Sequence, residues 1–213
     1  NVVNNITAEG ISVFNIGSLS MLGNTITDTG GDAALNVRTV AGDAFIQTTT
    51  IANTAGDGVF MQDVTGTSTF DRGMITNVGT AGGILRGHGF QAENLLGDLI
   101  LTNTTINTTQ SLEGVLIFAD VAGVNADYLI ENLTFMNPGH PDRDMFLSVE
   151  QGTIRADRLN VTFSPGFANP ASLSAGPMAD LTVFSDNLNT SMNIPNVTVS
   201  PVRTNNLMAP DAP

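Results

Sequence analysis

The chain has 213 residues with no cysteine and no lysine, and its 20 Asp and Glu outweigh seven Arg to give a formal charge of −13. Such an acidic surface repels nucleic acid and anionic membranes, so neither is an expected partner. Disulfides are excluded, and no apolar run reaches the ~18 residues of a membrane span, so no membrane insertion is expected. The charge can serve solubility, or it can attract Ca²⁺ or basic partners.

A short pattern recurs along the chain, in which an apolar residue stands beside Thr in a stretch rich in Thr and Asn. Spacings of 20 to 31 residues separate the apolar positions, which are Ile6, Ile26, Ile51, Ile75, Ile106, Phe135 and Phe163. A repeat of this length is typical of a stacked solenoid, in which each turn buries its apolar side against its neighbours. Because the sequence begins in mid-pattern at Asn1, we interpret it as a piece of a longer protein.

Each repeat contains three short apolar pieces separated by Gly, Asn, Asp and Thr, as in residues 51–60, 64–70 and 75–79. The pieces are rich in Val, Ile, Thr and Phe, which favours strands. No window carries apolar residues with helical spacing over three turns. The sequence therefore predicts an all-β protein with three short strands per turn.

Polar residues keep a fixed register to the repeat. Two residues after the key apolar position stand Asp28, Asn53, Asn77, Thr108 and Asn137. Three residues before it stand Thr48, Arg72, Asn103, Asn132 and Asn160. Asn and Asp tolerate the left-handed backbone of a sharp bend, so we predict that the first column lies at a bend and forms a polar ladder between turns. The second set is a further polar column.

Two further columns precede the key position. The one five residues earlier is apolar until its last member, and runs Ile46, Phe70, Leu101, Ile130 and Arg158. The one eight residues earlier runs Asp43, Thr67, Asp98 and Asp127. Asp98 and Asp127 on adjacent turns are either solvated turn residues or weak candidates for a shared Ca²⁺, which takes six to eight oxygen ligands. No other cofactor is expected.

The three-strand repeat resembles the right-handed parallel β-helix of bacterial surface and passenger-type proteins. The resemblance is architectural and implies about seven rungs over residues 1–163. All nine Pro follow residue 137, so residues 164–200 are expected to form looser last rungs or a cap, with strands at 181–184 and 196–199. Residues 201–213 are expected to be an extended or disordered tail.

Two insertions are candidate binding loops. The first carries Arg86, His88 and Phe90, and the second carries His140, Asp142 and Arg143. The Gly-His-Gly tripeptide at 87–89 is similar to a motif of pectin-degrading glycoside hydrolases, which share the β-helix fold. That similarity implies an alternative catalytic set of His88, Arg86 and Asp98. The paired acids and the Arg-x-Lys of those enzymes are missing, so we expect no catalytic centre and no carboxylate partner for His88.

The sequence therefore favours a structural or adhesive segment of a larger bacterial secreted or cell-surface protein. Its expected partners are neighbouring domains of a longer chain, or cell-surface carbohydrate or protein bound along the side of the solenoid. The alternative is a polysaccharide-active lyase or hydrolase that uses the loop containing His88.

Overall fold

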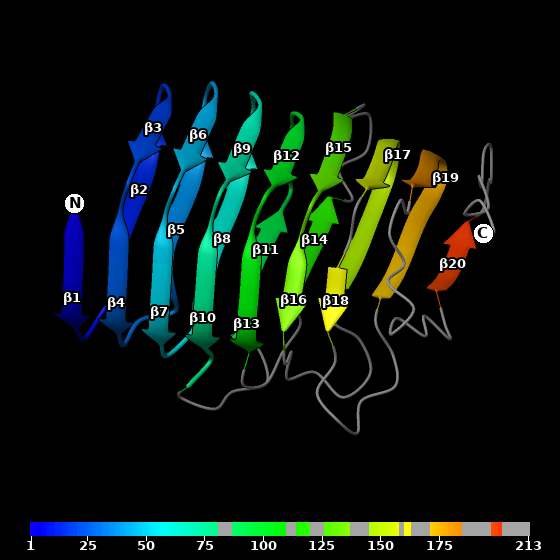
Figure 1. Ribbon diagram of the computed structural model, residues 1–213. Coiled ribbons are helices and arrows are strands. Elements are labelled where there is room, and N and C mark those ends of the chain that lie inside the picture. The colour runs from blue at the N-terminus through cyan, green and yellow to red at the C-terminus, as the bar shows by residue number, and fades with distance from the viewer. Residues whose placement is uncertain are drawn as a thin grey trace.

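The computed structural model describes residues 1–80, 87–109, 114–119, 126–136, 145–157, 160–162, 171–184 and 197–201. Every regular element within these ranges is a strand, and the strands stack side by side along one long axis (Figure 1). All of the pairings between them are parallel. The chain is thus an all-β parallel solenoid, as predicted.

The first strand of each turn belongs to a sheet of its own. This seven-stranded sheet contains, in order, β1 (Val2–Ile6), β4 (Thr25–Thr29), β7 (Thr50–Thr54), β10 (Met74–Val78), β13 (Thr105–Thr109), β16 (Thr134–Met136) and β18 (Asn160–Thr162).

The second and third strands of each turn form two further parallel stacks. The second strands are β2 (Ile11–Ile16), β5 (Ala33–Val40), β8 (Asp57–Val64), β11 (Phe90–Glu93) and β14 (Val115–Ala119). The third strands are β3 (Leu19–Leu22), β6 (Ala44–Gln47), β9 (Ser68–Asp71), β12 (Leu99–Thr102) and β15 (Ala126–Glu131). Three strands per turn are therefore confirmed.

The two stacks merge where the long strand β17 (Met145–Asp157) pairs with both β14 and β15. Beyond it, β19 (Ala171–Phe184) and β20 (Val197–Pro201) continue the stacking, so strands occur where 181–184 and 196–199 were expected. The seven-stranded sheet contains one first strand for each of the seven predicted rungs, and about four complete turns lie in the most fully described part of the chain. The assignment of a cap at 164–200 stays a prediction, and residues 202–213 lie outside the described residues.

The predicted apolar column is confirmed in its middle and wrong at its two ends. Ile26, Ile51, Ile75, Ile106 and Phe135 pair in register on successive turns. At the start, Val3 pairs with Ile26, whereas Ile6 pairs with Thr29 and is 37% exposed. At the end, Val161 pairs with Phe135, and Phe163 lies outside the described residues. At the end of the column the error is two residues, and residues two apart on a strand point to the same side, so the pattern allows either register. At the start the error is three residues, because the left-handed residue Asn5 lies between Val3 and Ile6 and interrupts the alternation.

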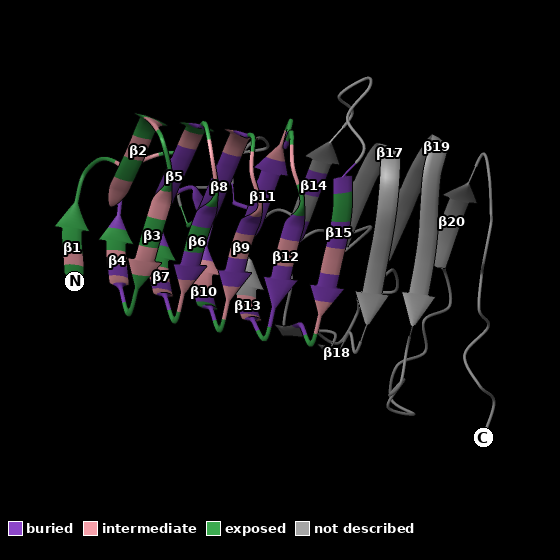
Figure 2. Cartoon of the chain, turned by 90° about the horizontal axis from the view of Figure 1, so that it is seen from above, coloured by how far each residue is buried: buried purple, intermediate pink, exposed green. Residues whose placement is uncertain are grey.

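The other two stacks supply the remaining interior columns. Ile46, Phe70, Leu101 and Ile130 form one fully buried column, as predicted. Its next member is Ala156, which pairs with Ile130, so the predicted break at Arg158 is wrong by the same two residues. Figure 2 shows that buried residues fill the middle turns and that exposure rises toward β1, β2 and β3. The hydrophobic core is therefore one continuous stack between the sheets.

The bends between strands have left-handed backbone geometry. The first bend carries Asn5, Asp28, Asn53 and Asn77, and the second carries Gly23, Thr48, Arg72, Asn103 and Asn132, all with φ between 48° and 64°. The bend predicted for Asp28, Asn53 and Asn77 is confirmed, and Asn137 lies outside the described residues. The second polar column is also a bend, but Asn160 does not belong to it, because it pairs with Thr134 and not with Asn132. A third bend, which sequence reasoning missed, carries Asn15, Thr39, Asp63 and Asn94 with the same geometry. Its members follow the same period, so that register could have found them.

Candidate functional site

The ladder at the first bend forms between side chains of successive turns. Asn53 donates from Nδ2 to Asp28 Oδ1 at 3.1 Å, and Asn77 donates from Nδ2 to Asn53 Oδ1 at 2.9 Å. The Asn53 amide thus donates to the preceding turn and accepts from the following turn, which stabilises the stacking. These exposed ladders have a structural role, as the sequence predicted.

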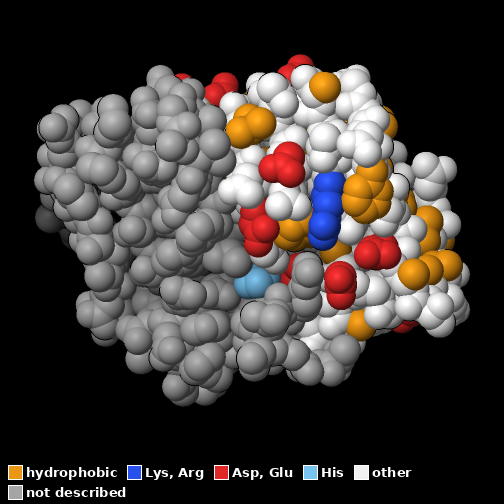
Figure 3. Space-filling view, turned by 180° about the vertical axis from the view of Figure 1, so that it is seen from behind, with side chains coloured by type: hydrophobic (Ala, Val, Ile, Leu, Met, Phe, Trp, Pro, Cys, Tyr) orange, Lys and Arg blue, Asp and Glu red, His pale blue; other side chains and the backbone are white. Residues whose placement is uncertain are grey.

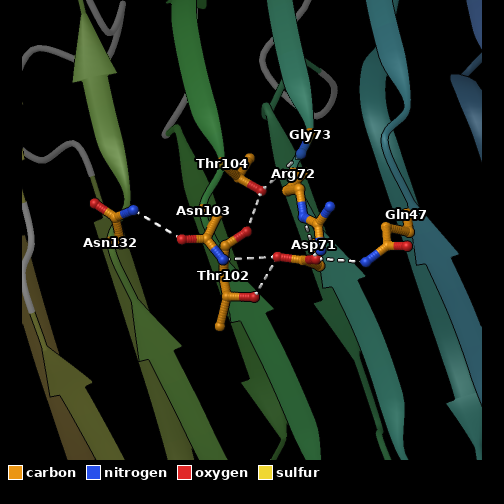
Figure 4. Close-up of polar contacts among 8 residues, drawn as sticks. All are labelled: Gln47, Asp71, Arg72, Gly73, Thr102, Asn103, Thr104 and Asn132. Atoms are coloured by element: carbon orange, nitrogen blue, oxygen red, sulfur yellow. Dashed lines mark hydrogen bonds and ion pairs between the residues drawn. The ribbon is translucent and has the colours of Figure 1, made fainter. Parts of the chain in front are cut away.

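The second bend builds its ladder around a carboxylate, that of Asp71 (Figure 4). One oxygen accepts from Gln47 Nε2 at 2.7 Å and from Arg72 Nε at 3.1 Å. The other accepts from Thr102 Oγ1 at 2.9 Å and from Asn103 Nδ2 at 2.8 Å. Asp71 therefore ties its own turn to the turns on both sides.

The surroundings of Asp71 have opposing effects on its acidity. Burial by itself would raise the pKa of the carboxyl, but hydrogen bonds from Asn103, Gln47 and Thr102 and the charge of Arg72 lower it below the ordinary value of 3.8. The ladder continues outward, because Asn132 donates from Nδ2 to Asn103 Oδ1 at 2.8 Å. All four lone-pair directions of the carboxylate have donors, so this cluster is built to hold the turns together.

The column that contains Asp98 and Asp127 lies at the start of the third strand of each turn, where its carboxylates bond to the backbone of the next turn. Asp98 Oδ1 accepts the backbone N–H of Asp127 at 2.9 Å, and Asp43 Oδ1 accepts that of Thr67 at 2.9 Å. Burial raises the pKa of Tyr128 to about 12, and the carboxylate charge of Asp98 adds to the effect. Because Asp98 bonds to protein backbone in the same way as Asp43, the column gives no support for Ca²⁺, and Ca²⁺ binding there stays a prediction.

His88 lies against a carboxylate, contrary to our expectation from the sequence. Its Nδ1 is 3.1 Å from Asp57 Oδ1, and the same oxygen accepts the backbone N–H groups of Gly87 at 2.6 Å and His88 at 2.9 Å. Asp57 is fully buried and His88 is 5% exposed. The prediction failed because Asp57 begins the strand of the preceding turn, so only the stacking brings it beside the insertion.

The pair formed by Asp57 and His88 has a definite chemistry. A carboxylate can only accept, so the imidazole places its hydrogen on Nδ1 and leaves Nε2 as the nitrogen that can exchange a proton. A carboxylate that orients a histidine in this way is a recurrent device of general acid–base sites. The pair also anchors the end of the first insertion to the corner of the solenoid.

The other predicted site residues are not brought to this pair. Phe90 is the first residue of β11, fully buried, with its ring centroid 5.5 Å from that of Phe70, so it is a core residue and not a loop residue. Asp98 precedes β12, at a different corner from His88. The remaining candidates lie outside the described residues: Arg86, His140, Asp142 and Arg143.

The outer face of β2, β5, β8 and β11 gathers polar and aromatic side chains that sequence reasoning did not single out. One row across it is Phe14, Arg38, Gln62 and Glu93, in register on four successive turns. A second row is Ser12, Asn36, Phe60 and Gln91. The strand alternation of period two could have found both rows once the register was known.

Arg38 is held in place on this outer face by two contacts. Its Nε donates to Asn36 Oδ1 at 3.0 Å, and its guanidinium carbon lies 4.6 Å from the centroid of the Phe60 ring. Phe14, the next residue along the row, is 49% exposed. Figure 3, which views the molecule from behind, shows a basic side chain beside hydrophobic ones with acidic side chains around them.

Comparison with protein families, with curated proteins and with solved structures finds no match for this chain. Among the residues that the structure describes, no three His, Asp or Glu are grouped so that they could hold a metal ion. The described part of the chain also contains no helix of the length and apolarity needed to span a membrane. The fold and the outer face are therefore the basis of the functional argument.

Proposed function

We propose that this chain is a structural or adhesive segment of a larger bacterial secreted or cell-surface protein. It binds carbohydrate or protein along the side of the solenoid, on the outer face of β2, β5, β8 and β11. The single observation that carries the proposal is the row on this face, where exposed Phe14 lies in register with Arg38 stacked on Phe60. Aromatic and arginine side chains are the residues most enriched where proteins bind their partners.

The arrangement of the solenoid supports this choice of face. The polar ladders at the bends bond mainly to each other, so their side chains are used in joining turns. On the outer face, by contrast, an exposed ring and a guanidinium stand on rigid strands, which hold a binding surface at low entropic cost. A rod with such a surface suits contacts along its length.

The test compares two exposed aromatic residues in the same protein. Phe14 is 49% exposed on β2, and Phe45 is 40% exposed on β6, whose outer face belongs to another stack. The intact chain and its Phe14→Ser and Phe45→Ser variants are screened on an oligosaccharide array and against purified cell-surface proteins. We expect binding that Phe14→Ser removes and Phe45→Ser leaves unchanged. Equal loss in both variants, or no binding by the intact chain, would contradict the proposal.

A second candidate function, a polysaccharide-active enzyme, is favoured by the pairing of His88 with Asp57 at 3.1 Å. In that function His88 Nε2 would exchange the proton of a substrate hydroxyl or leaving group while Asp57 orients the ring. The 5% exposure of His88 weighs against it, because a substrate bond must reach that nitrogen. For this reason the binding function ranks first.

The enzyme candidate is tested by incubating the intact chain with polygalacturonan and alginate and measuring reducing ends and unsaturated products. His88→Asn is the matched variant, because its Nδ2 can still donate to Asp57 but cannot exchange a proton. Activity that this variant abolishes, with its melting temperature unchanged, would establish the enzyme. No product from either protein would exclude these two polymers as substrates.

A further inference from the structure

Arg38 has an unusual electrostatic situation for a residue of so acidic a protein. Within the part of the chain that the structure describes, its side chain forms no ion pair, although Asp and Glu outnumber Arg by 20 to seven in the sequence. Its Nε bonds to the neutral Asn36, which is 2% exposed, and its plane rests on Phe60. Both contacts fix the guanidinium while neither neutralises it.

The carboxylate in the same row as Arg38, that of Glu93, bonds to another residue. Glu93 is the nearest acidic member of its row, but Gln62 lies between them, so two strand spacings, roughly 9–10 Å, separate the positions. Glu93 Oε1 also accepts from Gln91 Nε2 at 2.6 Å. Among the described residues, no carboxylate bonds to the terminal nitrogens of Arg38, which can therefore donate to a ligand.

We infer that Arg38 and Phe14 form the binding site for an acidic sugar, in which the guanidinium takes the carboxylate and the ring of Phe14 takes the sugar face. This inference rests on the proposed side-face binding and names its ligand class. A guanidinium donates two parallel hydrogen bonds to a carboxylate, and an anchored one loses little entropy when it does so. Phe14 supports the assignment because it is exposed and occupies the neighbouring turn of the same row.

The net charge limits the kind of acidic saccharide that fits. A charge of −13 repels a polymer with a carboxylate on every residue. One guanidinium can compensate one carboxylate, so the ligand is a single acidic sugar on an otherwise neutral glycan. A uronic acid and a nonulosonic acid both supply this chemistry, and the binding experiment distinguishes between them.

The experiment measures binding of the intact chain to three probes by calorimetry at low ionic strength. The probes are 3′-sialyllactose, a glucuronic-acid-terminated trisaccharide and lactose. We expect one acidic probe to bind at least about tenfold more tightly than lactose, because hydrogen bonds to charged groups are worth that much or more. The acidic probe that binds identifies the sugar class.

Two arginine variants distinguish bidentate hydrogen bonding by the Arg38 guanidinium from a long-range effect of positive charge on affinity. Arg38→Lys keeps the charge and loses the bidentate geometry, and we expect it to weaken the acidic probe about tenfold or more. Arg72→Gln is the control, since Arg72 is the described arginine that pairs with Asp71 at the second bend. It removes one positive charge elsewhere and should leave binding unchanged.

The outcomes distinguish this inference from the proposed function. Equal binding of lactose and the acidic probes, lost in Phe14→Ser, would overturn the acidic-sugar site and leave side-face binding intact. Equal weakening by Arg38→Lys and Arg72→Gln would also overturn it, because long-range charge would then explain the effect. Binding of acidic probes that Phe14→Ser does not weaken would overturn both proposals.

Discussion

Two carboxylates, Asp57 and Asp71, join neighbouring turns of this solenoid in different ways. Asp57 is fully buried and takes backbone N–H groups of residues 87 and 88 together with the ring of His88. Asp71 lies at the second bend and takes side chains from the turns before and after it. One carboxylate anchors an insertion, and the other is a member of a repeating ladder.

The difference between them shows how a repeat protein can accommodate irregularity. Side-chain donors around Asp71 can turn to water if the carboxylate is lost, because Asn103 is exposed. Backbone donors of a buried segment cannot turn away, so their loss is more costly. The buried backbone N–H groups of an insertion therefore require an acceptor at a fixed position. A ladder position, by contrast, can be occupied by Asp, Asn, Thr or Arg in different turns.

The largest expected effect on stability comes from the hydrophobic core next to the start of β8, where Asp57 lies. Ile75 is fully buried between Ile51 and Ile106, and a Cβ on Gly58 would lie 2.6 Å from its Cγ2. Ile75→Ala should lower the free energy of unfolding by about 2–5 kcal/mol through lost burial and a new cavity. Urea denaturation measures the change. A loss well under 1 kcal/mol would contradict the prediction that the interior column contributes more to stability than either carboxylate.

Removal of the buried carboxylate should have the next largest effect. Asp57→Ala leaves the two N–H groups of Gly87 and His88 without this acceptor, and should cost about 2–4 kcal/mol. Asp57→Asn keeps one oxygen acceptor and should cost less, which makes it the matched control. Hydrogen exchange at residues 87 and 88 reports the anchoring directly. Unchanged exchange in Asp57→Ala would contradict the role assigned to this carboxylate.

The ladder carboxylate should have a smaller effect that depends on pH. Asp71→Asn should destabilise by about 1–3 kcal/mol at neutral pH, because it loses charge-assisted hydrogen bonds. The pKa of Asp71 is lowered on folding, so its contribution is complete above the ordinary value of 3.8 and is lost as the pH falls through the lower folded pKa. The difference between the two proteins should therefore shrink below pH 4. A difference that stays constant from pH 7 to pH 2 would contradict this assignment.

The smallest expected effect is at the exposed ladder of the first bend. Asn53 has φ 56° and bonds to Asp28 and Asn77. Asn53→Val should cost about 1–2 kcal/mol, because a β-branched residue resists positive φ and cannot donate. Asn53→Gly is the control that removes the strain but keeps the ladder broken. If both variants unfold at the same temperature, the loss of stability comes from the broken ladder and not from backbone strain at position 53.

Much of the architecture was predictable because every turn repeats the same physical requirements. The column of Ile51 and Ile75 and the left-handed bend at Asn53 followed from residue spacing and residue type. Residue spacing failed toward the two ends of the repeat, by three residues at Ile6 and by two residues at Phe163 and Arg158. In a repeat, a shift of two residues keeps the same side of the strand, so the sequence pattern barely distinguishes the two registers.

The sequence by itself determined the all-β class, the three strands per turn and the polar ladders, because these depend on local propensity and on a period that repeats. The tertiary structure decided what lies across neighbouring turns: Asp57 beside His88, and Arg38 between Asn36, Phe60 and Phe14. These residues are up to 31 positions apart and share no motif. Their contacts depend on the register of stacked strands, which brings distant positions within about 4.8 Å of one another.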